Sequence, residues 1–375
     1  MSADLVNEFT RTVFNHLFAA QNSTGNIAFS GLSLYSLMAV INLGLGGRSR
    51  EQLSSFLNRR FTQLFDESLF NPPEDMQACY NDRELIKSVS ELSYYVFHCC
   101  GIFDPYRSTS KQFFDLNIQV LSLRHQNMIA PTRNEWINNK IYGLMNNLLK
   151  DSLDSDSQLV FINTLFFNNN WFIPFNIEDT KQEIFRDDKD RPLMVSMMNH
   201  EDYYQIYVDY PHDVTVLFIP LKQVYVYGVV VLPREGYALK DMIKNFRWDE
   251  VHDYYRKSEW RTIHLKMPKF KICSENNLIN ALALFDITDI FNEDVADLRV
   301  MIKSKGYIEK LAQLAIVSID ENGEKPEAPT KNRVTYDASL SYENFAIDRP
   351  FLFLIYAHST KQILFSMAVT NPNKE

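Results

Sequence analysis

The sequence is poor in the features that mark several large classes of protein. Only 11 of its 375 residues are glycine, so long flexible linkers are not expected. It has no run of 18 apolar residues, so no transmembrane helix and no membrane insertion are predicted. The net charge is −9 at pH 7. Because this leaves no domain-wide basic excess to neutralise phosphates, nucleic acid is not an expected partner.

Signatures of metal, cofactor and catalytic chemistry are missing as well. No G-x-S-x-G, P-loop, H-E-x-x-H or G-x-G-x-x-G motif is present, and the eight histidines are scattered. The acidic run at 151–156 lacks the glycine and the terminal glutamate of a calcium loop. We therefore expect no active site, no metal and no cofactor. Structural thiols, without the spacing of a zinc site, are expected at Cys79, Cys99, Cys100 and Cys273.

The first twenty residues lack the uninterrupted apolar core of a signal peptide, because Asp4, Glu8 and Arg11 break it. The sequence therefore predicts no cleavable signal, and a protein that stays in the cytoplasm or is exported by a non-classical route. Apolar residues recur at helical spacing from Leu5 to Phe18. This spacing predicts an amphipathic first helix.

Core-forming residues are plentiful. Hydrophobic residues make up 46% of the chain and aromatic residues 13%, which is ample for a large core. The weight of Asn, Phe and Tyr is typical of an AT-rich genome, such as that of a parasite or a virus. Helical patterns come first and strand patterns dominate later, an order that favours an α+β fold over alternating βαβ units.

The local patterns place most of the expected elements. Residues 60–85 are polar and contain two prolines, which suggests an exposed excursion. Ser49 and Gln52 have the spacing of a capping box at the start of a helix. The other expected helices lie at 34–43, 136–149 and 276–284. The expected strands lie at 26–30, 92–97, 158–167, 214–219, 224–232 and 262–272.

One connection is too long for an ordinary loop. A strand pattern at 315–319 and another at 351–356 are separated by roughly thirty residues. Most loops in compact domains have about 4–6 residues, and those beyond about 12–15 are usually functional or disordered. The remainder of the sequence is an apolar scaffold. We therefore expect the scaffold to present this loop.

Five ordered motifs over most of the chain resemble the serpin family. Two departures from the family pattern are Gly31, where proline is usual, and Gln313, where many serpins have a histidine. Gln313 still offers a hydrogen-bond donor. The motifs are NIAFSGLS at 26–33, NTLFFNNNW with a following PF at 163–175, a Phe, Val and Met set at 185–198, LKMPKF at 265–270, and DRPFLF at 348–353 with Asn371-Pro372.

The resemblance implies the fold and the function. It implies a single serpin domain over 1–375, of the ovalbumin-like type without a cleaved signal peptide, with three β-sheets, about nine helices and an exposed reactive loop at about 321–345. It also implies a monomer that inhibits a serine protease as a suicide substrate. The protease attacks the loop and forms an acyl-enzyme, and the cut loop then inserts as a strand in the central sheet and distorts the protease.

The resemblance also implies which residues support insertion. The shutter and breach positions, which line the region that the loop enters, are Ser30, Ser33, Asn163, Trp171 and Gln313.

The hinge at the start of the loop departs from what insertion requires. Glu321 and Gly323 fit the family pattern, but Glu324, Pro326 and Pro329 replace the small residues that usually follow. A buried carboxylate without a partner is unfavourable, and proline removes a hydrogen bond from a central strand. Together these residues cost roughly 3–8 kcal/mol. The alternative function is a non-inhibitory serpin with a binding, storage or chaperone role.

The attacked bond is placed by counting from either end of the loop. Counting from Gly323 puts Asp337 at the attacked carbonyl, with Ala338 on the leaving side. Counting back from Phe345 gives Tyr336 instead. Loop length varies in the family, so both positions stay open.

Each candidate position suits a different protease. Tyr336 suits a chymotrypsin-like pocket and Asp337 an Asp-specific protease. Arg333 suits a trypsin-like pocket, and Ala338 or Leu340 an elastase. The two counts favour Tyr336 or Asp337. The expected partner is therefore a target protease, with chymotrypsin-like and elastase-like serine proteases preferred.

Overall fold

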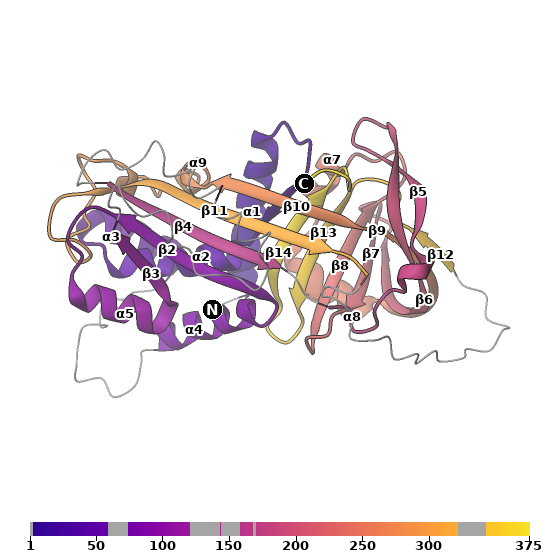
Figure 1. Ribbon diagram of the computed structural model, residues 1–375, viewed down its shortest axis with the longest axis horizontal. Helices are drawn as coiled ribbons and strands as arrows, with labels where there is room; N and C mark the ends of the chain where they lie inside the picture. Colours follow the sequence, from indigo (N-terminus) through magenta and orange to yellow (C-terminus); the bar gives the residue numbers. More distant parts are fainter. Residues whose placement is uncertain (1–2, 59–73, 121–142, 144–157, 168–169, 322–342) are drawn as a thin grey trace. The chain divides into compact units, whose positions relative to one another are not determined.

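The computed structural model describes residues 3–58, 74–120, 143, 158–167, 170–321 and 343–375 (Figure 1). The chain divides into two compact units. Apart from Met1, unit 1 comprises Leu32–Phe166 and Ser274–Ala315, and unit 2 comprises Ser2–Gly31, Phe167–Cys273 and Ile316–Glu375. The expectation of a single domain over 1–375 stays a prediction.

Unit 1 contains most residues of a five-stranded sheet with the strand order β10-β11-β4-β2-β3. The strands are β2 Ser90–His98, β3 Leu116–Val120, β4 Gln158–Phe167, β10 Phe270–Asn277 and β11 Tyr307–Ile319. The helices are α2 Gly31–Leu43, α3 Gly47–Leu57, α4 Glu74–Lys87, α5 Asp104–Phe114 and α9 Ile279–Ala283, with the 3₁₀ turn η3 Asp289–Phe291. Helices α4 and α5 pack beside β2 and β3 (Figure 1).

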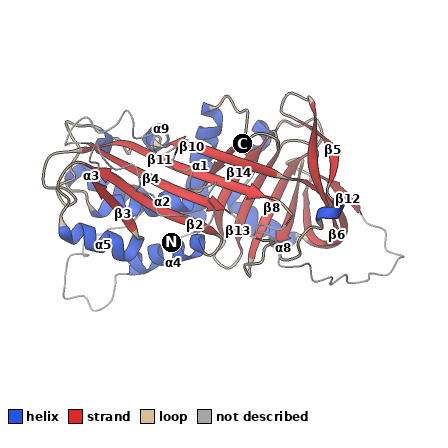
Figure 2. Ribbon diagram, viewed as in Figure 1, coloured by secondary structure: helices blue, strands red, loops and turns tan. Residues whose placement is uncertain are grey.

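Unit 2 contains the nine remaining described strands (Figure 2). They form a nine-stranded sheet with the order β1-β14-β13-β8-β7-β6-β9-β12, and β5 pairs with β6. Its helices and 3₁₀ turns are α1 Ala3–Ala20, η1 Ile177–Asp179, α7 Leu239–Asn245, η2 Trp248–Glu250 and α8 Val251–Lys257. Its strands are β1 Ile27–Phe29, β5 Lys181–Arg186, β6 Pro192–Asp209, β7 Val214–Pro220, β8 Val226–Pro233, β9 Glu259–Pro268, β12 Glu343–Ala346, β13 Phe351–Ala357 and β14 Gln362–Val369.

The expected α+β class is confirmed, but the number of sheets differs from the expectation. The described residues form two hydrogen-bonded sheets and eight α-helices. Two groups of strands merge because β6 is 18 residues long. One part of it pairs with β9 from Met197 to Ile206, and its last residues pair with β7 from Gln205 to Asp209. One continuous strand therefore joins what would otherwise be separate sheets.

Several local predictions are confirmed. Helix α1 buries one stripe, which includes Phe9 and Phe14, as its helical spacing predicts. Strand β4 has the predicted bounds and is buried from Leu159 to Phe167, as expected of a continuous apolar run. Strands β7 and β8 form the expected antiparallel pair. None of the four cysteines, all of which lie in the described ranges, is in a disulfide; Cys79 and Cys100 are buried and the other two half-buried.

Four local predictions are wrong or incomplete. The expected excursion at 60–85 contains α4 in its described part, because Met76 and Cys79 bury one side of a polar segment. Ser49 is no cap: it is buried and its hydroxyl accepts from the Asp297 amide. The strand expected at 262–272 is two strands, β9 and β10, separated at Lys269. The helix expected at 276–284 is only Ile279–Ala283. The one at 136–149 lies outside the described residues except for Gly143.

Two kinds of feature are absent from the described residues. No helix among them is long and apolar enough to cross a membrane. They also contain no group of three or more His, Cys, Asp or Glu side chains placed to hold a metal ion.

Candidate functional site

Both ends of the long loop are anchored in unit 2. The described chain leaves β11 through Asp320 and Glu321, and it returns at Glu343, the first residue of β12 (Figure 1). Most of the predicted hinge and bond residues lie outside the described residues, so their positions stay predictions. These are Gly323, Glu324, Pro326, Pro329, Arg333, Tyr336, Asp337 and Ala338.

The side chain of Glu321 is fixed in a buried ion pair. Glu321 is 5% exposed. The Lys269 ammonium lies 2.7 Å from one carboxylate oxygen, and the Thr180 hydroxyl donates to the other at 2.7 Å. Burial alone would raise the pKa of Glu321, but the hydrogen bonds from Lys269 and Thr180 outweigh it and hold the pKa below its usual value. The first hinge residue is therefore held as a carboxylate.

The backbone at this point is held as well. The Phe175 amide donates to the Glu321 carbonyl at 3.0 Å, and the Trp171 indole N–H donates to the Asp320 carbonyl at 2.8 Å. We call Trp171, Phe175, Thr180, Lys269, Asp320 and Glu321 the hinge anchor. Trp171, predicted as a breach residue, thus contacts the chain just before the loop.

A glycine makes room for Trp171. The Trp171 ring packs edge-on against Phe175 at 5.6 Å and Phe353 at 6.5 Å between ring centroids. A Cβ on Gly228 would lie 2.9 Å from Phe353 and 3.2 Å from Trp171. Sequence reasoning missed Gly228, because its neighbours are distant in the sequence and the strand pattern around it gives no signal.

A half-buried histidine contacts the hinge anchor. The His200 ring meets Phe175 edge-on at 5.5 Å, and its Nδ1 lies 2.6 Å from the Tyr204 hydroxyl. Burial lowers the pKa of His200, and the nearby carboxylates of Asp202, Glu201 and Asp179 offset this only in part. The neutral imidazole is therefore favoured here. The scattered positions of the histidines in the sequence gave no indication that His200 would contact Phe175 and Tyr204.

Three of the five predicted shutter and breach residues come together in unit 1. Asn163 Oδ1 accepts two hydrogen bonds, from the Ser33 hydroxyl at 2.7 Å and from Gln313 Nε2 at 2.9 Å. Its amide nitrogen donates to the Ser93 carbonyl at 3.3 Å, and all three predicted residues are fully buried. Gln313 therefore supplies a donor where the family often has histidine. We call Ser33, Asn163 and Gln313 the shutter cluster.

Ser30 does not belong to that cluster. Its hydroxyl donates to the Leu364 carbonyl in β14 at 2.6 Å, within unit 2. A residue that sequence reasoning missed does contact the shutter cluster, since the Tyr94 hydroxyl donates to the Ser33 carbonyl at 3.4 Å. Burial raises the pKa of Tyr94, so it stays a neutral donor.

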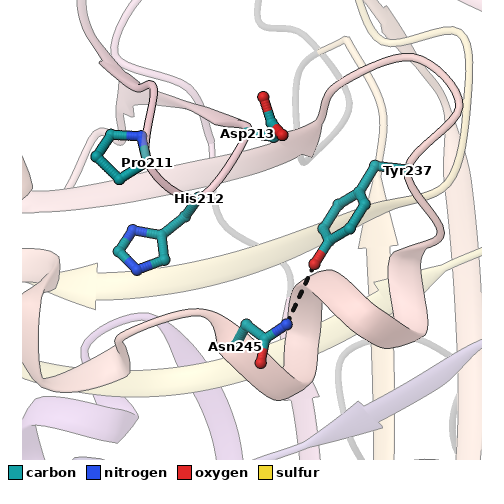
Figure 3. Close-up of a pocket in the computed structure, with 5 residues that line it drawn as sticks. All are labelled: Pro211, His212, Asp213, Tyr237 and Asn245. Carbon is teal, nitrogen blue, oxygen red and sulfur yellow. Dashed lines mark hydrogen bonds between the residues drawn. The ribbon is translucent and has the colours of Figure 1, made fainter.

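A small polar cavity of about 270 Å³ lies elsewhere in unit 2 (Figure 3). At one side the Asn245 amide donates to the Tyr237 hydroxyl at 3.1 Å. Beside it, His212 Nδ1 lies 2.8 Å from the buried Asp209 carboxylate. The cavity contains none of the predicted site residues. Its lining residues are Pro211, His212, Asp213, Tyr237 and Asn245.

Comparison with known proteins gives one consistent result. The family model described as Serpin (serine protease inhibitor) matches residues 4–372. Leukocyte elastase inhibitor A of Mus musculus is 26% identical over 363 residues, which covers 93% of this chain and 94% of that protein. The matches confirm the serpin resemblance.

Solved structures agree in fold. Uncleaved ovalbumin superposes with a TM-score of 0.80 at 22% identity and covers 99% of this chain and 100% of its own. Human thyroxine-binding globulin complexed with its hormone superposes with a TM-score of 0.77 at 20% identity, over 99% of this chain and 100% of its own. At these identities the likeness is one of fold alone.

Proposed function

Because this chain belongs to the serpin family, we propose that it is a serine-type endopeptidase inhibitor that acts as a suicide substrate. The family model is described as a serine protease inhibitor, which favours inhibition and not catalysis. The proposal takes the chain as one monomeric domain with its reactive loop at about 321–345. We further propose that it is cytoplasmic or exported by a non-classical route.

The observation that carries the proposal is where the loop begins. It starts two residues after Ile319, the end of β11, and β11 is hydrogen-bonded next to β4 among the described strands. A cut loop that folds back along β11 becomes its antiparallel neighbour through a tight turn near Glu321. Such a strand enters between β11 and β4. The sheet gains a full ladder of backbone hydrogen bonds there, which favours insertion.

Two sets of contacts oppose insertion of the loop before cleavage. The bond from Gln313 on β11 to Asn163 on β4 bridges the two strands that must separate. The hinge anchor fixes Glu321. Each set contains only a few polar contacts, and each contact contributes about 1–3 kcal/mol. The Gln313–Asn163 bond and the hinge anchor therefore stabilise the uncleaved structure, but by less than the hydrogen bonds that a new strand would add.

The hinge sequence supports a second candidate, a non-inhibitory serpin with a binding, storage or chaperone role. Glu324, Pro326 and Pro329 oppose insertion by roughly 3–8 kcal/mol in total. Inhibition is a race between insertion and hydrolysis of the acyl-enzyme. Slow insertion therefore turns an inhibitor into a substrate.

The target is proposed from the loop and from the relatives. The name of the mouse relative, leukocyte elastase inhibitor A, favours an elastase-like enzyme, which Ala338 or Leu340 would suit. Tyr336 suits a chymotrypsin-like one. Asp337 and Arg333 stay open as further positions for the attacked bond.

The test is incubation of the full chain with chymotrypsin, elastase and trypsin in turn. An inhibitor gives an SDS-stable adduct with at least one of them, and the mass of the released C-terminal peptide identifies the cut bond. A matched variant with Glu324→Thr, Pro326→Ala and Pro329→Ala raises the ratio of adduct to cleaved product. Clean cleavage without adduct in both proteins, across the whole panel, refutes the inhibitor function and leaves the non-inhibitory one.

A further inference from the structure

Helix α8 depends on its packing in unit 2, because it is short. It has seven residues, of which Val251 and Tyr254 are buried, and it packs on β6 of the nine-stranded sheet. Isolated helices shorter than about 12–15 residues are marginal in water. His252 and Tyr255 lie at positions i and i+3, so they share one side of the helix, and both are half-buried. The contacts of these two side chains therefore help to hold α8 in place.

Two hydrogen bonds join this side of α8 to the sheet. His252 Nδ1 lies 2.8 Å from the Tyr356 hydroxyl in β13, and the Tyr255 hydroxyl lies 2.8 Å from the Tyr227 hydroxyl in β8. Burial raises the pKa of Tyr356 and of Tyr227, so both stay neutral near pH 7. Histidine is the residue type that changes its charge between pH 5 and 8. His252 is therefore the group in these two bonds that responds to mild acid.

A second histidine stacks on the first. His358 directly follows β13, and its ring lies 5.1 Å from that of His252 between centroids, at an interplanar angle of 28°. The Tyr255 ring lies 4.4 Å from His358. His358 Nδ1 is a buried atom without a hydrogen-bond partner among the described residues. Because an imidazolium has a proton on both nitrogens, protonation of His358 leaves a buried donor without an acceptor, which is unfavourable. We call His252, Tyr356 and His358 the histidine cluster.

The charges around the two histidines also favour their neutral forms. Burial lowers the pKa of His252, and positive charge on Lys361 and on His358 lowers it further. Asp253 and Arg256, on the same helix, have smaller and opposite effects on that pKa. Burial and then Lys361 lower the pKa of His358 as well. The other titratable groups packed against His358 are Tyr227, Tyr255 and Tyr356.

Protonation therefore weakens the contact between α8 and the sheet in three ways. Two imidazolium rings at this separation repel each other, and the new donor of His358 has no acceptor. Positive charge on His252 also lies in the first turn of α8, where the helix dipole opposes it. We propose that the histidine cluster is a pH-sensitive switch that holds α8 on the sheet near neutral pH and releases it in mild acid, before unit 2 unfolds as a whole. This device is independent of the inhibitor function.

The direction of the pH dependence follows from the lowered pKa of both histidines. The form with α8 packed binds fewer protons than the released form, so the switch stabilises the packed form above the ordinary histidine value of about 6.5. That stabilisation is lost as the pH falls below this value. The equilibrium constant for release then rises by up to about a hundredfold for each pH unit if release takes up two protons, and by about tenfold if it takes up one.

The test is hydrogen exchange of the full chain between about pH 7.5 and about pH 5, the range in which histidine titrates. The readout is the protection of amides in α8, corrected for the intrinsic effect of pH on exchange, with β7 as the internal reference. The variants are His252→Gln, His358→Gln and the double variant. The matched control is His16→Gln, because His16 is half-buried in the same unit and is not part of the histidine cluster.

The expected result is a loss of protection in α8 that is at least about tenfold larger than in β7 as the pH falls from about 6.5 to about 5. Each single variant has the original protection at pH 7.5 and loses less of it in acid, and the double variant loses least. Lys361→Asn removes a positive charge and moves the fall to lower pH. Asparagine suits this position, because Lys361 has a φ of 59°, which asparagine adopts more readily than most residues.

Other outcomes refute the switch. If α8 and β7 lose protection together, the transition is global unfolding and not release of α8. If His252→Gln and His358→Gln lower the protection of α8 equally at both pH values, the two histidines have a packing role alone. The switch is also refuted if α8 stays protected in acid, or if His16→Gln flattens the fall as much as the cluster variants do. None of these results bears on whether the chain forms an adduct with a protease.

Discussion

Substitutions at the buried pair of Glu321 and Lys269 are expected to have unequal effects. Glu321 has a side chain that is 6% exposed, whereas that of Lys269 is 38% exposed. Lys269→Met therefore leaves a buried carboxylate with only the Thr180 hydroxyl as a side-chain donor. Glu321→Gln leaves an ammonium that water still reaches, and an amide oxygen that still accepts from Thr180. The lysine substitution is thus the more damaging of the two.

The expected losses of unfolding free energy follow from values measured for buried ion pairs in other proteins. Breaking a buried pair by removing one partner costs about 3–5 kcal/mol. Because one end of this pair is partly solvated, we expect about 2–4 kcal/mol for Lys269→Met. We expect about 1–2 kcal/mol for Glu321→Gln, the loss of one charged hydrogen bond. In the double variant neither charge is left alone, so its loss is smaller than the sum of the single losses.

The assay is urea unfolding of the four proteins at pH 7, repeated at acid pH. The pKa of Glu321 is lowered in the folded chain, so its stabilising effect is present above the unfolded value of about 4.3. That effect is lost as the pH falls through the folded value, and the four proteins then converge. Additive losses at pH 7, or a larger loss for Glu321→Gln than for Lys269→Met, would refute the reasoning.

Three further predictions concern the shutter, the tryptophan site and pH. Gln313→Leu removes a donor to Asn163 and is expected to lower unfolding stability by about 1–2 kcal/mol, whereas Gln313→His keeps a donor and loses less; equal losses in thermal melts would contradict this. Gly228→Ala places a methyl group 2.9 Å from Phe353 and is expected to cost about 1–3 kcal/mol, with a change in tryptophan fluorescence; an unchanged spectrum and melting point would count against the packing described. Because burial lowers the pKa of His200, the folded chain binds fewer protons than the unfolded one, so stability falls as the pH drops below about 6.5; His200→Gln should flatten that fall between pH 6.5 and 5 in urea titrations, and an unchanged slope would argue against it.

Local patterns predicted those elements whose burial is continuous or strictly periodic. Strand β4 is apolar along its whole length and is buried almost throughout, so its pattern and its environment agree. Helix α1 has one apolar stripe and buries it. In both cases the sequence near the element contains the information that decides its structure.

The failures have the opposite cause, which is a distant partner. Ser49 and Gln52 have capping spacing, yet Gln52 donates to Asp289 and Ser49 accepts from Asp297, both more than two hundred residues away. Strand β9 ends before Lys269, whose amide donates to the Ser196 carbonyl. No local pattern contains such partners. A tertiary contact therefore overrides a correct reading of spacing.

In the candidate site too, some residues were predicted from the sequence and others depend on contacts with distant parts of the chain. The resemblance predicted Glu321 and Trp171, and the structure gives each a specific contact at the start of the loop. It did not predict Gly228, which matters only because Trp171 and Phe353 converge on it. Nor did it predict His200, whose role depends on Phe175 and on burial. Residues that act through packing are invisible until the fold brings their neighbours together.

The central claim is that the cut loop enters the sheet between β11 and β4. The most direct measurement is a comparison of thermal unfolding of the intact chain and of the chain cleaved once within 333–340. Insertion adds a strand to the five-stranded sheet, so the account predicts a higher melting temperature for the cleaved form. Each kcal/mol of added stability raises the melting temperature of a chain of this length by roughly 1 °C, so a whole central strand, which contributes many kcal/mol, is expected to raise it by ten degrees or more. A cleaved form that melts at the same temperature as the intact chain would contradict the account.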